Sequence, residues 1–346
     1  MSLTYTAYQA RIFIKLSGFF LAIIVLGYMG SVAAIKAWEA AHPKLIKPTV
    51  RYGLLPKIVF PEKQYEKKTF ALELPNDAVP DLGDQMKVYL VFRPDKDVMA
   101  FEHDKQTAKN LGFAGEPVKI ADGIYEFGNN NLNYQLIMNV VEGSFKLQYP
   151  YKNDQTLMAM KKIPNKEQAI SMARGYLSTA GKWSKDLEDG EQKVSFWKIE
   201  IDGLKAVSSQ SEGNVARVEF FRKNLEDKFK IMSTNIAEAP ISVMVTGMGD
   251  SQRNIVEFNF KYADIDREAF STYPIKSTAA AIEDLKGGNY WPAVDTSSKT
   301  ATIRKVYLAY LEPFTLTSFM QPIYVFEGDG NFVAYVPAVD RNWVKE

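Results

Sequence analysis

Hydrophobic and polar positions divide the chain into three regions, and the first is an uncharged run near the N-terminus. Residues 16–35 carry no charged side chain, and Lys15 and Lys36 flank them. At about 1.5 Å per residue, a helix of this length spans about 30 Å, the thickness of the hydrocarbon core of a bilayer. The pattern therefore predicts a single transmembrane helix that anchors the protein in the lipid bilayer.

Residues 36–68 form the second region, which contains Pro43, Pro48, Pro56 and Pro61 together with several basic side chains. Proline removes a backbone donor and clashes with the preceding helical turn, so this composition predicts an extended, semi-rigid linker without helix. The Lys and Arg side chains are also suited to contact anionic lipid headgroups. A plain spacer is the other interpretation, and the two roles are compatible.

The third region shows a short capped helix, a glycine stop and antiparallel strands, and its clearest copy begins at Asn165. Asn165 and Gln168 have the spacing of a capping box, and Gly181 stands where the helix is expected to end. The Asp202-Gly203 pair predicts an antiparallel hairpin. The expected helical face is Ala169, Ala173, Tyr176, Leu177 and Ala180, and the expected strands are residues 194–201 and 215–221.

The same pattern recurs before and after this copy, with helices expected at residues 97–112 and 277–288. It predicts an α+β fold in which repeated helix-plus-antiparallel-sheet units follow the transmembrane helix in two lobes, residues 69–163 and 164–346. The other expected strands are residues 124–127, 134–141, 144–149, 241–246, 255–262, 302–311, 323–326 and 332–336.

Composition narrows the classes of partner. The 42 basic and 41 acidic residues are interspersed and give a net charge of +1, so no electrostatic footprint for nucleic acid is present. Cysteine is absent, which excludes disulfides, thiolate metal sites and a cysteine nucleophile. The absence fits a domain in an oxidising exterior, and chance in a cysteine-poor proteome explains it equally well.

Charge near the uncharged run indicates the orientation in the membrane. Residues 1–15 contain Arg11 and Lys15 and no acidic residue, which favours a cytoplasmic N-terminal tail. Basic residues beyond the run, in residues 36–51, weaken this asymmetry. We expect a single-pass plasma-membrane protein with an extracytoplasmic C-terminal domain.

Several segments, together with the N-terminal anchor, resemble the YycH/YycI-like regulatory proteins and, more broadly, PepSY-like modules. The resemblance is carried by residues 167–177, 273–288, 306–310, 321–326 and 334–338, and it is best over residues 165–340. It implies tandem PepSY-like units in the second lobe, no enzymatic activity, and a membrane or envelope protein as partner, such as a sensor kinase. It implies no cofactor.

The sequence contains none of the common catalytic motifs. The two histidines, His42 and His103, stand outside any H-E-x-x-H sequence, and no nucleophile elbow, P-loop or dinucleotide fingerprint occurs. We therefore expect a non-catalytic protein-binding or regulatory module of the cell envelope. The alternatives are a glycan or peptidoglycan hydrolase that uses a carboxylate pair, and a self-associating structural subunit of a surface assembly.

Two groups of residues are candidate sites. Asp264, Asp266 and Glu268 alternate along the chain and present oxygen ligands of the kind Ca²⁺ takes, although a turn capped by Asp266 is the preferred interpretation. The second group is a candidate apolar patch for a partner, although coverage of a sheet edge is the preferred interpretation. The patch consists of Phe314, Leu316, Phe319 and Met320.

Overall fold

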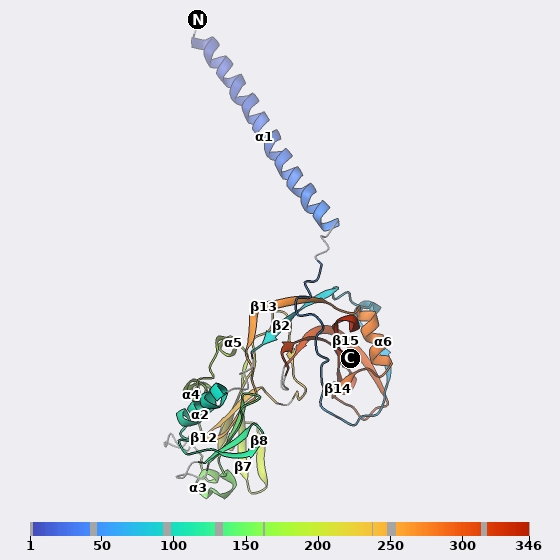
Figure 1. The fold of residues 1–346 in the computed structure, drawn as a ribbon. Helices are drawn as coiled ribbons and strands as arrows, with labels where there is room; N and C mark the ends of the chain where they lie inside the picture. Colours follow the sequence, from blue (N-terminus) through green and yellow to red (C-terminus); the bar gives the residue numbers. More distant parts are fainter. Residues whose placement is uncertain are drawn as a thin grey trace. The chain divides into compact units, whose positions relative to one another are not determined.

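The computed structural model describes residues 3–41, 47–92, 98–128, 134–161, 163–236, 238–247, 254–312 and 317–345. The chain forms two compact units, Met1–Lys47 and Pro48–Glu346. The described part of the first unit is helix α1 (Leu3–Ala41), drawn in blue in Figure 1. Its stretch Lys15–Trp38 contains the predicted span and is a candidate membrane span, and a signal sequence near an N-terminus meets the same criteria.

Helix α1 continues past the predicted span into the region expected to be a non-helical linker. Residues 36–41 are helical, so the prediction was wrong there. The physical reason is composition, because this stretch is rich in alanine and precedes Pro43. Helices usually end at or before the residue that precedes a proline, which is consistent with an end of α1 at Ala41 before Pro43.

Residues 48–68, also expected to be a linker, are part of the second unit and contribute to its core. Leu55 is fully buried and lies in a cluster with Val88, Tyr273 and Val339. The backbone N–H of Leu55 donates to the carbonyl of Trp343, and that of Lys345 donates to the carbonyl of Leu55, each at 2.8 Å. The sequence reading missed this because apolar side chains alternate with Lys and Pro, a pattern that also fits an exposed stalk.

Within the described residues, an antiparallel sheet of nine strands has the order β3-β4-β5-β6-β12-β11-β9-β7-β8. The Asp202-Gly203 turn joins β7 to β8, a strand that the sequence reading omitted, and β9 pairs with the other side of β7. The strands are β3 (Val118–Ala121), β4 (Ile124–Gly128), β5 (Gln135–Asn139), β6 (Ser144–Gln148), β7 (Gln192–Glu200), β8 (Gly203–Val207), β9 (Val215–Phe220), β11 (Ile241–Val245) and β12 (Ile255–Phe260).

Helices α2 (Val98–Asn110) and α4 (Lys166–Thr179) pack against this sheet (Figure 1). The predicted capping box is confirmed, because the Asn165 side chain accepts from the Gln168 backbone at 2.8 Å and the Gln168 side chain accepts from the Asn165 backbone at 3.1 Å. The predicted helical face is confirmed too, since Tyr176 is partly buried and the other four residues are buried.

Gly181 ends α4 as predicted. It has φ +68°, a left-handed conformation that glycine adopts without strain. The Gly181 N–H donates to the Ser178 carbonyl at 3.0 Å, and the Lys182 N–H donates to the Leu177 carbonyl at 2.8 Å. These two bonds make a Schellman motif, which places Lys182 immediately beyond the helix.

Replacing Gly181 with valine is expected to lower the free energy of unfolding by about 1–2 kcal/mol, because a β-branched residue is strained at positive φ. No atom lies within 4 Å of a Cβ built at this position, so the loss reports backbone strain without steric clash. Thermal unfolding of the purified chain measures it. Gly181→Asn is the control and should cost less, since asparagine tolerates the left-handed region; equal melting of all three chains would contradict the assignment.

A second sheet of the described residues has the order β1-β15-β17-β18-β14, with β10 also paired to β15. Helix α6 (Thr278–Lys286) is capped by the Ser277 hydroxyl, and its predicted residues Ala281, Ile282 and Leu285 are buried in this sheet's core. The strands are β1 (Thr69–Leu72), β10 (Ile231–Met232), β14 (Trp291–Val294), β15 (Thr300–Leu311), β17 (Pro322–Gly328) and β18 (Val333–Pro337).

A third, small sheet has the order β13-β2-β16, formed by Ile265–Pro274, Gln85–Val91 and Phe319–Met320. The chain also forms short helices. They are α3 (Gln155–Met158), α5 (Lys185–Glu188) and the single 3₁₀ turns η1 (Pro75–Asp77), η2 (Tyr151–Asn153), η3 (Gln210–Glu212), η4 (Asp329–Asn331) and η5 (Arg341–Trp343).

The structure mixes helices with sheets and is rich in strands, which agrees with the α+β class in its coarse form. Strand pairing, however, crosses the predicted lobe boundary between residues 163 and 164. Strand β1 pairs with β15, β2 with β13, and β6 with β12. Strands that follow α2 and those that follow α4 share one sheet, so each predicted unit does not have a sheet of its own.

Candidate functional site

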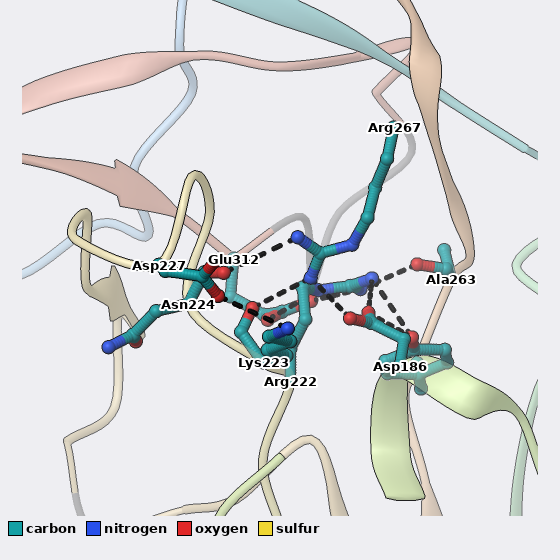
Figure 2. Close-up of polar contacts among 9 residues, drawn as sticks. Asp186, Arg222, Lys223, Asn224, Asp227, Ala263, Arg267 and Glu312 are labelled. Carbon is teal, nitrogen blue, oxygen red and sulfur yellow. Dashed lines mark hydrogen bonds and ion pairs between the residues drawn. The ribbon is translucent and has the colours of Figure 1, made fainter. Parts of the chain in front are cut away.

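A buried arginine occupies the region where the sheets approach one another (Figure 2). Arg222 follows β9, and its side chain is completely buried. Its guanidinium donates to the carboxylates of Glu312 at 2.8 Å and Asp186 at 2.9 Å. It also donates to the Tyr262 hydroxyl at 3.0 Å and the Ala263 carbonyl at 2.6 Å.

Asp186 on α5 extends these contacts to a second arginine. Its carboxylate accepts from the Tyr262 hydroxyl at 2.7 Å and from the guanidinium of Arg267 on β13. Arg267 also donates to the backbone carbonyl of Lys223 at 2.8 Å. Two arginines and two carboxylates thus form a network of balanced charge, which we call the Arg222 network (Asp186, Arg222, Arg267 and Glu312).

Neighbouring groups in the Arg222 network keep Arg222 charged. Burial alone would lower the pKa of Arg222, but the neighbouring Glu312, Tyr262 and Asp186 outweigh burial and raise it. Burial and the Asp186 carboxylate together raise the pKa of Tyr262, so its hydroxyl remains a donor. Since the four side chains come from α5, the end of β9, β13 and the end of β15, the network ties all three sheets together.

A cleft of about 640 Å³ opens beside this network. Arg222 and Glu312 contribute to its wall, and the remaining charged side chains are of both signs. These are Lys193, Lys223, Lys230, Asp189, Glu191, Asp227 and Glu238. Mixed charge around an open cleft suits contact with a polar protein surface rather than selection of a single ion.

The predicted apolar patch is only partly in the described residues, since Phe314 and Leu316 lie outside them. Phe319 is half-buried and packs on Tyr52 with ring centroids 5.0 Å apart. Met320 is fully buried in the core of the second sheet, so its side chain is not available on the surface. The sequence did not predict the burial of Met320, because an apolar residue at the start of a strand does not reveal which face of the sheet it occupies.

A groove of about 220 Å³ lies beside Phe319. One wall comes from residues 56–59 and the other from residues near the two ends of the 311–321 segment. Val59 is 69% exposed at this groove, while its neighbours Ile58 and Phe60 pack inward. We call it the Val59 groove, with lining residues Pro56, Lys57, Ile58, Val59, Leu311, Glu312, Thr317, Ser318, Phe319 and Gln321.

The predicted calcium candidates adopt the alternative arrangement. One carboxylate oxygen of Asp266 accepts from the backbone N–H groups of Glu268 at 2.9 Å and Ala269 at 3.0 Å, so Asp266 caps a turn. Asp264 is exposed and directly precedes β13. In the part of the chain that the structure describes, no three His, Asp or Glu side chains are grouped to hold a metal ion.

A third cleft, of about 340 Å³, lies where α2, the end of α4 and the end of β12 meet. Asp104 on α2 lines it and is only 6% exposed. Burial raises the pKa of Asp104 to about 6, although the nearby Lys182 and His103 partly oppose the rise. The sequence reading missed Asp104; its signal was an acidic residue spaced four positions from Ala100 and Ala108 on the buried face of the helix.

Replacing Asp104 with asparagine is expected to stabilise the protein at pH 8 by on the order of 2 kcal/mol. A carboxyl group with a raised pKa stabilises the folded state below its unfolded value near 3.8, and this contribution is lost as the pH rises through about 6. The advantage of Asp104→Asn should therefore shrink between pH 8 and pH 4.5, as thermal melts across that range would show. A difference that does not change with pH would contradict a buried titrating carboxyl.

No protein-family model matches the chain, and no curated protein matches it. Among solved structures, an uncharacterized protein from Eubacterium rectale ATCC 33656 is similar with 12% identity and a TM-score of 0.39, over 73% of this chain and 82% of that chain. The Bacillus megaterium YpeB C-terminal domain is similar with 13% identity and a TM-score of 0.29, over 72% of this chain and 96% of that one. Both TM-scores are low, so neither similarity assigns a function to this chain.

Proposed function

We propose that this protein is a membrane-anchored, non-catalytic module whose second unit, Pro48–Glu346, binds another protein of the cell envelope outside the cytoplasm. The candidate span Lys15–Trp38 supports the anchor. The basic N-terminal tail supports a cytoplasmic N-terminus.

The observation that carries the binding proposal is the Val59 groove. It combines an exposed apolar side chain, Val59, with half-buried Ile58 and Phe319, and all three line the groove. An apolar side chain of the partner would fill the groove, and Lys57 at its rim would contact polar groups of the partner.

Photo-crosslinking from position 59 tests the groove. A crosslinking amino acid at this position, activated in intact membranes, should capture one envelope protein that mass spectrometry identifies. Val59→Asp should abolish co-purification of that protein, whereas Val118→Asp, a change at a valine on β3 that is 64% exposed, should leave it unaffected.

Other outcomes of the crosslinking distinguish the alternatives. Capture of the protein's own chain in a ladder of sizes would favour a structural subunit that self-associates. Equal recovery of the partner with Val59→Asp and Val118→Asp would mean that the Val59 groove is not the binding surface.

Protease treatment of intact cells tests the orientation. The second unit should be degraded without permeabilisation, whereas an epitope tag placed before residue 1 should be protected until the membrane is opened. The reverse pattern would place the second unit in the cytoplasm and remove the envelope partner from the proposal.

A further inference from the structure

The Asp104 cleft, of about 340 Å³, contains polar groups that the fold itself does not satisfy. Asp104 is only 6% exposed. Neither a hydrogen bond nor an ion pair links its side chain to another residue that the structure describes. The hydroxyl oxygen of Ser184, which also lines the cleft, is buried without a hydrogen-bond partner. Buried polar groups are nearly always hydrogen-bonded, so the Ser184 hydroxyl indicates that a partner is missing, and the Asp104 carboxyl beside it lines the same cleft.

Lys182 lines the same cleft, together with His103 and the acidic residues Glu142 and Asp264. Its ammonium is near enough to Asp104 to act on that carboxyl electrostatically, and no ion pair between the two is found among the described residues. The Lys182 ammonium lies 5.6 Å from the centre of the Phe260 ring. Because Lys182 directly follows Gly181 in the Schellman motif, its backbone is fixed while its side chain points into the cleft.

Aromatic side chains complete the walls. Phe260 and Tyr262 are buried with 3% and 6% exposure, and Trp183 stands beside Lys182. A cavity of this size is at the lower end of the range for small-molecule sites, which are apolar with a few converging polar groups. A ligand that satisfies the cleft must offer a donor to Asp104, an acceptor to Lys182 and Ser184, and an apolar part to the rings.

We propose that this cleft binds a small zwitterion of the α-amino acid class. Its ammonium group would bond to the Asp104 carboxylate. Its carboxylate would accept from the Lys182 ammonium and the Ser184 hydroxyl, and its side chain would lie against Phe260 and Tyr262. A ligand that bonds to both Asp104 and Lys182 explains why a buried carboxylate lies near a lysine with which it forms no ion pair.

A thermal-shift screen of the detergent-solubilised full chain with the individual L-amino acids tests this proposal at pH 7.5. At ten times its Kd, a bound amino acid should raise the melting temperature by about 2 °C. The N-acetyl and methyl ester derivatives of the same amino acid each lose one of the two charges, and neither should produce the shift. No shift with any L-amino acid, or an equal shift with both derivatives, would overturn the proposal.

Variants then assign the contacts, with affinity measured by equilibrium dialysis of the radiolabelled amino acid. Asp104→Asn and Lys182→Met should each weaken binding by about tenfold or more, and Lys182→Arg should restore part of the affinity. Asp202→Asn, an exposed change in the turn between β7 and β8, is the matched control and should bind as the unaltered chain does. Unchanged binding by Asp104→Asn, a variant expected to fold stably, would show that the ligand occupies another site.

Discussion

Replacing Arg222 with alanine is expected to lower the free energy of unfolding by about 3–5 kcal/mol, because the change leaves buried carboxylates without their counter-charge. Asp186 keeps Arg267 as a partner, but Glu312 is only 4% exposed and loses the guanidinium that bonds it. Because the Arg222 network ties the three sheets, the variant should unfold earlier as a whole. Unfolding of the purified chain in guanidinium chloride, followed by tryptophan fluorescence, measures the loss of free energy.

Arg304 offers a matched control, since it also bonds two carboxylates. It donates to Asp329 and Glu73, each at 2.6 Å, but its side chain is 52% exposed. Exposed ion pairs contribute little because water and salt screen them. Arg304→Ala should therefore cost far less than Arg222→Ala, and equal losses for the two variants would show that burial is not what makes the Arg222 network important.

Replacing Leu55 with alanine is expected to cost about 2–4 kcal/mol, the usual range for removing a buried leucine side chain. Leu55 is fully buried in its cluster with Val88, Tyr273 and Val339, so truncation leaves a cavity that these side chains cannot readily fill. The loss, measured by thermal unfolding, would show that residues 48–68 form part of the folded unit.

The adjacent residue is the control for this prediction. Leu54 is 48% exposed, so Leu54→Ala should change the free energy of unfolding by less than about 0.5 kcal/mol. If both variants melt as the unaltered chain does, residues 48–68 are a detached stalk after all, as the proline content alone had suggested.

Features that depend on neighbouring residues were predictable from the sequence. The Asn165 and Gln168 capping box, the stop at Gly181 and the cap at Ser277 each involve residues within a few positions of one another. Several strand ranges, such as those of β11 and β12, followed from the pattern of polar and apolar side chains, whereas β2, β8 and β13 were not predicted. The turn capped by Asp266 was likewise predicted, and it is confirmed.

Features that depend on which strands become neighbours were not predictable in the same way. Met320 was expected on the surface and is buried, because β16 pairs with β2, a strand more than two hundred residues earlier. The lobe boundary failed for the same reason, since β1 and β2 pair with strands from the other end of the chain. Side-chain pattern indicates that a strand exists but not its partner.

By itself, the sequence determined the uncharged span of residues 16–35, the helix caps and the α+β class, because each follows from local propensity or from one continuous stretch. Only the tertiary structure decided that Leu55 belongs to the core, that Arg222 meets Glu312, and that Asp104 faces Lys182 across a cleft. These contacts join residues from 33 to 284 positions apart along the chain. Chain folding brings them together, and burial then gives their charges the energetic weight that the sequence alone does not reveal.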